Sequence, residues 1–236
     1  MLCSSLMQTG ITGNPAEFFN PPLLNQLYTI QRLGLGKDEE FIPKMFETIT
    51  TQNGVAGLKL PAHHTGFFVE KIAEYMGLPV STLYSAIDHI FPNVRYIFLT
   101  RNDKVAQAVS YFRANVTGEW TRYTDGVGKA AFVQFHHLGI ETCLRRIERS
   151  NAYWESYFNL HGISPLRITY EELLGDFESV ISRVHRLLNL PIDTPSLLPT
   201  TIRMGDSKSK EWAEEFRRLG RIDLPQIPQT DIWAKF

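Results

Sequence analysis

Cysteine is scarce in this sequence, since Cys3 and Cys143 are the only two among 236 residues. Two cysteines are too few for a disulfide framework and lack the spacing of zinc ligands, a usage that fits a reducing cytoplasm. Long apolar runs are also missing, because none approaches the ~20 residues that cross a membrane. The N-terminus lacks the charged region and long apolar core of a signal peptide. These absences predict a soluble, cytoplasmic protein.

An excess of charge of either sign is absent too. The 24 Lys and Arg residues nearly cancel the 25 Asp and Glu residues, so nothing indicates a broad surface for nucleic acid or membrane, and any basic site must be local. Four of the seven histidines occur as adjacent pairs, at 63–64 and 136–137, which do not give the i, i+4 geometry of a helical metal site. No G-x-S-x-G or Walker A motif occurs. Metal-dependent and serine-hydrolase chemistry are therefore disfavoured.

What is present suffices for one sizeable core, with 43% hydrophobic and 12% aromatic residues, so we expect a single domain over residues 1–236. Short β-rich runs alternate with helical patterns, which is typical of a parallel sheet covered on both faces. The sequence predicts an α/β fold with strands in 55–60, 94–100 and 165–170, helices in 66–77, 81–90, 102–116, 128–161 and 171–190, and loops over 117–128 and from 191 onward.

Capping residues and helix breakers refine these boundaries. Ser81 is a candidate N-cap for the helix over 81–90, and Asn102 or Asp103 for the helix over 102–116. Gly139 is a candidate break in the long helix over 128–161.

The carboxyl ends of the expected strands are the first places to look for a ligand site. Lys59, Arg101 and Tyr170 lie at these ends. Arg101 also precedes a helix start, where free N–H groups favour an anion, and Ser110 lies about two and a half turns further on. An arginine guanidinium and a serine hydroxyl that line one pocket could together bind a phosphate group. Taken alone, such an arginine is more often a surface or ion-pair residue.

A second basic cluster lies in "TTIRMGDSKSKEWAEEFRR", where Arg203, Lys208 and Lys210 crowd a loop that leads into a helix carrying Trp212. Such loops can bring cations and backbone amides to a phosphate. A solvated, charged turn is the alternative.

The opening "MLCSSLMQTGITGNPAEFF" has the pattern of an amphipathic helix that breaks at Gly10. It then places one acid, Glu17, between Pro15 and the pair Phe18 and Phe19. A carboxylate in such an apolar turn is partly desolvated and held in place, conditions that suit a general base. A solvent-facing turn residue is the alternative.

These segments together resemble the bacterial sulfotransferases typified by mycobacterial trehalose 2-sulfotransferase, which use 3′-phosphoadenosine 5′-phosphosulfate (PAPS). The resemblance covers nearly the whole chain. Its most specific parts are "TGITGNPAEFF" (9–19) and "TRNDKVAQAVSYFRA" (100–114), and "GLKL" (57–60), the Trp120 loop and "KSKEWAEEFRR" (208–218) support it. It implies a sulfotransferase-type fold with a P-loop-like parallel sheet flanked by helices.

For the nucleotide, the resemblance implies that Arg101 and Ser110 hold the 3′-phosphate of PAPS. The loop with Arg203 and Lys208 would close over the same nucleotide, and Tyr170 would pack near the adenine.

For the reaction, the resemblance makes Glu17 the general base that takes a proton from a sugar hydroxyl. Lys59 would neutralise charge on the bridging or sulfuryl oxygens, much as cations serve phosphoryl transfer. Trp120 offers an apolar plate for a sugar ring. No metal is needed, the acceptor would be a sugar or glycolipid such as trehalose, and the resemblance leaves room for a homodimer.

Members of this family open with a strand and a Ser/Thr/Gly-rich loop that holds the 5′-phosphosulfate, and Met1 aligns just after that loop. We therefore expect the first strand to be missing here and the natural reading frame to continue upstream. We also expect the 236-residue chain alone to be poorly soluble or marginally stable, and inactive with PAPS. The alternative is a non-catalytic nucleotide-binding or scaffolding domain that has lost the loop.

Overall fold

The computed structural model describes residues 2–20, 41–120, 133–192 and 206–222. The chain divides into two compact units: unit 1 comprises Met1–Thr100 and Ser150–Pro199, and unit 2 comprises Arg101–Arg149 and Thr200–Phe236. Most of the loop expected over 117–128, and of the tail expected from 191, lies outside the described residues. The expectation of a single domain stays a prediction.

The sheet of unit 1 has two parallel strands among the described residues, β1 (Ile97–Thr100) and β2 (Leu166–Thr169). Their register pairs Ile97 with Leu166 and Thr100 with Thr169, so both carboxyl ends lie at one edge. Two of the three predicted strands are thus confirmed.

The third predicted strand, over 55–60, is wrong. This run forms only isolated bridges, Thr50 with Ala56 and Ala16 with Leu58. Each bridge involves a single residue of a different segment, so no continuous ladder forms. Gly57, between the two bridged residues, has no side chain that could pack on a neighbouring strand. The run therefore joins these segments without entering the sheet.

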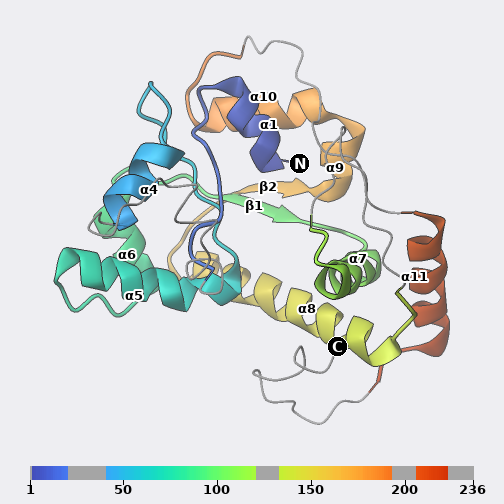
Figure 1. Ribbon diagram of the computed structural model, residues 1–236. Helices are drawn as coiled ribbons and strands as arrows, with labels where there is room; N and C mark the ends of the chain where they lie inside the picture. Colours follow the sequence, from blue (N-terminus) through green and yellow to red (C-terminus); the bar gives the residue numbers. More distant parts are fainter. Residues whose placement is uncertain (1, 21–40, 121–132, 193–205, 223–236) are drawn as a thin grey trace. The chain divides into compact units, whose positions relative to one another are not determined.

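The helices of unit 1 cover both faces of this sheet (Figure 1). On one face, an apolar cluster joins β2 to the helices that flank it, with Leu6, Ile168 and Ile181 among its buried members. On the other face, Phe98 of β1 packs in the cluster that holds Phe158. The unit contains α1 (Leu2–Thr9), α4 (Phe41–Ile49), η1 (Ala62–His64), α5 (Thr65–Met76), α6 (Leu83–Ile90), α9 (Tyr170–Gly175), α10 (Phe177–Leu187) and the last residues of α8 (His137–Leu160).

Two predicted helix boundaries in unit 1 need correction. The single helix expected over 171–190 is two helices, because Asp176 ends α9 and its carboxylate accepts from Ser179 N–H to cap α10. Thr82, not Ser81, caps α6, since its hydroxyl accepts from Ser85 N–H at 3.1 Å. In both places a side-chain oxygen that satisfies free helix amides decides the boundary.

Unit 2 packs α7 (Lys104–Thr117), α11 (Ser207–Leu219) and the N-terminal part of α8 around a second core that includes Phe112, Ile140 and Trp212. Asp103 caps α7, one of the two predicted caps. The predicted break at Gly139 is wrong, because α8 runs through it. A Cβ at Gly139 would lie 2.4 Å from the Phe112 ring, so this glycine permits a close contact between helices.

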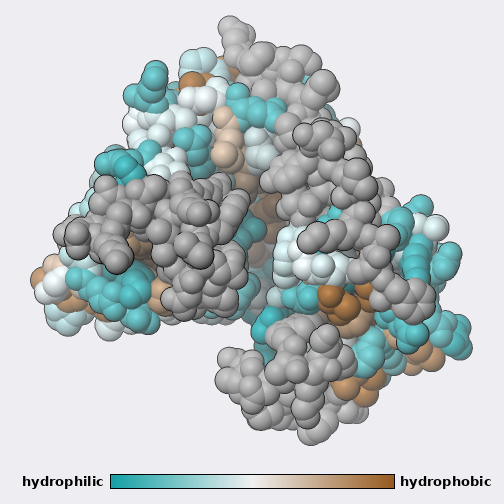
Figure 2. Space-filling model, viewed as in Figure 1, coloured by the Kyte–Doolittle hydropathy of each residue, from teal (hydrophilic) through white to brown (hydrophobic). Residues whose placement is uncertain are grey.

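Within the described ranges, no helix combines the length and apolarity needed to cross a bilayer. On the face drawn in Figure 2, hydrophobic residues occur in small groups between hydrophilic ones.

Candidate functional site

Glu17 is positioned by backbone hydrogen bonds that link its own segment to the segment that carries Lys59. Ala16 and Leu58 form a parallel bridge, and Lys59 N–H donates to Ala16 C=O at 3.0 Å. Asn14 N–H and Gly57 N–H both donate to Ile49 C=O, at 2.8 and 3.0 Å, which ties both segments to the end of α4. Glu17 and Lys59 are consequently brought side by side.

Two glycines allow this close approach. Gly13 has φ +77°, and a Cβ on it would lie 2.4 Å from Gly57 N. A Cβ on Gly57 would in turn lie 2.9 Å from Pro15. Larger residues would push the two segments apart, so the glycines of "TGNP" and "GLKL" serve the geometry around Glu17.

Buried aromatic rings fix the chain after Glu17. Phe18 and Phe19 are 1% and 0% exposed. The Phe19 ring lies edge-on to Phe41 and Phe68, with centroids 5.7 and 4.8 Å apart. Glu17 itself keeps 25% of its side chain exposed. The expected setting, an acid at the edge of an apolar anchor, is what the structure shows.

The Glu17 carboxylate has a different neighbour at each oxygen. Lys59 Nζ lies 2.7 Å from Oε2 and keeps 55% of its side chain exposed. His64 Nδ1 lies 3.2 Å from Oε1, and only 3% of the His64 side chain is exposed. This pair of atoms is close, but its angle does not make a hydrogen bond. We call these three residues the Glu17 cluster.

His64 is a neutral imidazole at physiological pH. Burial lowers its pKa from 6.5 to about 4, and the neighbouring His63 and Lys59 lower it further, while Glu17 opposes this shift. A neutral imidazole can donate one N–H without adding charge to the cluster.

Sequence reasoning missed His64, because it judged the histidine pairs only as metal ligands. One feature points to His64. It lies five residues after Lys59 at the N-cap position of α5, and its side chain makes no capping hydrogen bond there.

The predicted 3′-phosphate residues lie at the start of unit 2. Arg101 directly follows β1 and is partly buried, and Ser110 lies in α7. Arg101 precedes the helix and is not part of it, since α7 begins at Lys104. Burial alone would raise the pKa of Asp103, but the Ala106 N–H and the guanidinium groups of Arg217 and Arg101 hold it below its usual range. Asp103 therefore stays ionised at the α7 N-terminus, where it caps the helix and pairs with Arg217.

The remaining predicted nucleotide residues fall in three places. Tyr170 is the first residue of α9 and directly follows Thr169 of β2, which pairs with Thr100. Lys208 lies in the first turn of α11 rather than in a loop, with Nζ 5.6 Å from the centre of the Trp212 ring. Arg203 lies outside the described residues.

An ion pair that sequence reasoning missed joins α7 to the start of α11. Arg113 Nη1 and Nη2 donate to the two oxygens of Asp206 at 2.6 and 3.0 Å. The Arg113 guanidinium, with the Ser209 N–H and hydroxyl, holds the pKa of Asp206 far below its usual range. Arg113 thus fixes the helix that carries Lys208.

Trp120, the predicted plate for a sugar ring, is 59% exposed. Its ring centroid lies 5.7 Å from that of Tyr111 in unit 2.

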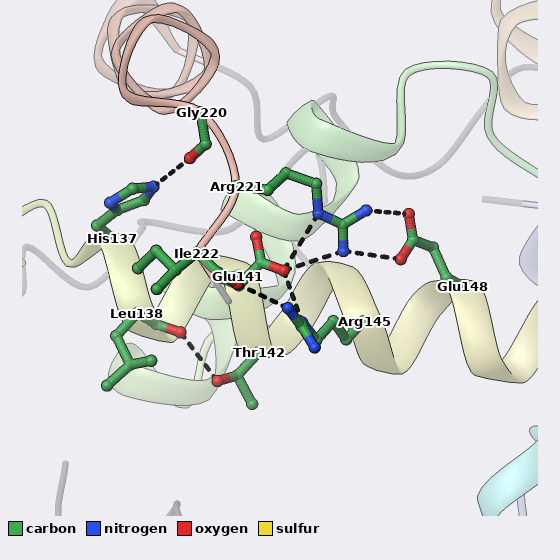
Figure 3. A network of polar contacts seen from close by, with 9 residues as sticks. All are labelled: His137, Leu138, Glu141, Thr142, Arg145, Glu148, Gly220, Arg221 and Ile222. Carbon is green, nitrogen blue, oxygen red and sulfur yellow. Dashed lines mark hydrogen bonds and ion pairs between the residues drawn. The ribbon is translucent and has the colours of Figure 1, made fainter. Parts of the chain in front are cut away.

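A second carboxylate network lies in unit 2, where Arg221 is held between Glu141 and Glu148 (Figure 3). Glu141 is fully buried, and its Oε1 accepts from Arg145 Nε at 2.7 Å and from Arg221 Nη2 at 2.9 Å. Arg145 also donates to Ile222 C=O at 2.6 Å. We call this the Glu141 network. It ties the chain after α11 to α8 and borders a hollow of about 430 Å³ that Lys104, Phe216 and Arg217 help to line.

Within the described ranges, no group of three or more His, Cys, Asp or Glu residues is arranged to hold a metal ion.

The chain belongs to the Stf0 sulphotransferase family, whose model matches residues 1–219. This confirms the predicted family and the α/β class with a small parallel sheet flanked by helices. More particularly, the chain is 28% identical to a trehalose 2-sulfotransferase of Mycolicibacterium smegmatis, over 94% of this chain and 91% of that protein. It is 26% identical to a trehalose 2-sulfotransferase of Mycobacterium tuberculosis, over 95% of this chain and 92% of that protein.

Proposed function

We propose that this protein transfers a sulfuryl group from PAPS to a carbohydrate hydroxyl. The family and the names of the two relatives support sulfuryl transfer. The observation that carries the proposal is the Glu17 cluster: a partly exposed carboxylate, anchored by two buried phenylalanines, with one oxygen on Lys59 and the other beside a neutral histidine.

In the proposed reaction, the acceptor oxygen attacks sulfur in line with the bond to the leaving phosphate. An O–S bond to the sugar forms, the S–O bond to the nucleotide breaks, and adenosine 3′,5′-bisphosphate leaves. Glu17 takes the proton that the hydroxyl loses, which avoids a charged oxygen on the sugar as the bond forms. A carboxylate within hydrogen-bond reach of the hydroxyl is suited to this role.

Lys59 has two tasks in this mechanism. Before the reaction, its ammonium orients the carboxylate through the 2.7 Å contact with Oε2. Once Glu17 is protonated, that contact loses its ionic character, and the exposed ammonium can turn to the negative charge on the sulfuryl and bridging oxygens.

For the nucleotide, we assign the residues that the family resemblance implies. Arg101 and Ser110 hold the 3′-phosphate through a guanidinium and a hydroxyl. Tyr170 packs near the adenine, and Lys208 and Arg203 close over the nucleotide.

For the acceptor we infer a sugar or glycolipid, with trehalose as the first compound to try because both relatives carry it in their names. Trp120 would offer its exposed ring to the sugar. We place the enzyme in the cytoplasm, where Cys3 and Cys143, both free thiols, stay reduced.

The test uses the protein from its natural reading frame, with any in-frame codons that precede Met1. Titration with adenosine 3′,5′-bisphosphate measures binding, and labelled PAPS with a panel of sugars and glycolipids measures turnover. Binding with transfer to a carbohydrate supports the proposal. Binding without transfer to any acceptor or to water would favour a non-catalytic nucleotide-binding domain. No binding by the folded protein would overturn the PAPS assignment.

A further inference from the structure

The contact between His64 and Glu17 has no part in the mechanism above. We propose that His64 is a positioning residue for the reaction: its imidazole Nδ1–H directs Oε1 of Glu17 and so sets the plane of the carboxylate. This inference rests on the proposed role of Glu17 as the base.

The two oxygens of Glu17 need separate contacts to fix their plane. Lys59 reaches Oε2 on a long side chain that is 55% exposed, so on its own it leaves the carboxylate free to rotate about a soft terminal torsion. His64 supplies the second contact, with Nδ1 3.2 Å from Oε1. A small rotation of the carboxylate would align this pair as a hydrogen bond, and catalytic hydrogen bonds commonly tighten when substrate binds.

Backbone hydrogen bonds hold the turn that carries His64. His64 N–H donates to Pro61 C=O at 2.9 Å, and the Thr65 hydroxyl donates to Ala62 C=O at 2.9 Å. The His63 ring packs on the His64 ring with centroids 4.1 Å apart, while His63 itself is exposed. His64 is thus a buried side chain in a rigid turn, as a positioning residue requires.

A neutral donor suits this task better than a charged one. Burial keeps the His64 imidazole neutral, so it orients the carboxylate without adding a second positive charge beside Lys59. A second positive charge would weaken the attraction of Glu17 for the proton of the acceptor. The arrangement requires the tautomer with hydrogen on Nδ1.

Three substitutions separate positioning from packing. In His64→Asn the amide nitrogen is bonded to Cγ, as Nδ1 is, so it can still donate to Oε1. In His64→Gln the amide lies one bond further out, and His64→Leu has no donor. We expect His64→Leu and His64→Gln to lower kcat by about 10- to 100-fold, and His64→Asn to stay within about three-fold of the wild type. Affinity for adenosine 3′,5′-bisphosphate should be unchanged in all three, and His89→Gln on the exposed face of α6 is the matched control.

Equal kcat values for His64→Asn and His64→Gln, in folded proteins, would overturn the positioning role, and this pair decides the matter if His64→Leu does not fold. Absence of turnover by the wild type would overturn the proposed function and this inference with it. A readout apart from turnover is the ¹⁵N chemical shift of the His64 ring. We expect hydrogen on Nδ1 in the wild type and its loss from Nδ1 in Glu17→Leu, and hydrogen on Nε2 in the wild type would contradict the proposed contact.

Discussion

The Glu17 cluster and the Glu141 network each place a carboxylate between two basic side chains, yet the two differ in what they leave available. Glu141 is fully buried, and two guanidinium groups bond to it. Glu17 is 25% exposed, with one ammonium and one neutral imidazole. A carboxylate whose charge is fully compensated holds helices together, whereas one that is oriented and still open to solvent can receive a substrate proton.

The largest expected effect is the loss of turnover when the Glu17 carboxylate is replaced. We expect Glu17→Gln to lower kcat by about 10²- to 10⁴-fold, because the amide keeps the shape but cannot accept the proton. Affinity for adenosine 3′,5′-bisphosphate should barely change, as titration would show. Near wild-type turnover would mean that another group takes the proton.

The matching change in the Glu141 network should act on stability. Glu141→Gln leaves Arg145 without its carboxylate partner and Arg221 paired with Glu148 alone, and we expect a loss of about 2–3 kcal/mol in the free energy of unfolding. This is below the usual range for a broken buried ion pair because both arginines reach solvent. Glu148→Gln, on a carboxylate 39% exposed, is the control and should cost less than about 1 kcal/mol. Urea denaturation measures both, and equal costs would contradict the distinction.

Arg101 tests whether the start of unit 2 binds the nucleotide. We expect Arg101→Ala to weaken binding of adenosine 3′,5′-bisphosphate by about 1.5–3 kcal/mol, the range for hydrogen bonds to a charged group. Arg95→Ala, on an exposed arginine ahead of β1, is the control. Unchanged affinity on calorimetric titration would make Arg101 a purely structural residue.

The smallest effect concerns the pH dependence that His64 gives to stability. Its pKa is lowered from 6.5 to about 4 in the folded chain, by burial first and then by the neighbouring His63 and Lys59, while Glu17 opposes the shift. As pH falls, His64 is therefore protonated in the unfolded state before it is protonated in the folded state. Its contribution to the free energy of unfolding is complete above the pKa of the unfolded state and declines as pH falls toward the pKa of the folded state.

Between pH 8 and pH 5, this decline should amount to about 2 kcal/mol. Denaturation of the wild type and of His64→Gln at both pH values isolates the contribution of His64 to the free energy of unfolding. His89→Gln, at an exposed histidine, is the control. The same pH dependence in the wild type and His64→Gln would show that burial does not perturb His64.

The order and type of most elements could be predicted from sequence, because their signals are local. Asp103 before α7, for example, acts within one turn of its helix. The failures have causes that local patterns do not carry. Asp176 divides one apolar pattern into two helices, and Gly139 accommodates a ring from another helix instead of ending its own.

The candidate site shows the same limit. Local patterns single out Glu17 and Lys59, and the resemblance gives them their roles. Their contact, however, depends on the bridge between Ala16 and Leu58, which brings two distant segments together. His64 reaches Glu17 through the turn that follows Lys59, a contact that depends on the path of three segments. The partner of Arg113 lies 93 residues away at Asp206. Contacts between distant residues are set by packing, so no spacing rule predicts them.

The most direct test of the contrast between the two carboxylates is the single-turnover rate of sulfuryl transfer from bound PAPS, measured for Glu17→Gln and Glu141→Gln at a temperature where both are folded. The account predicts a rate at least about 100-fold below the wild type for Glu17→Gln and a rate within about three-fold of the wild type for Glu141→Gln. Similar rates for the two variants would contradict it, because the Glu17 carboxylate would then be no more than another structural ion pair.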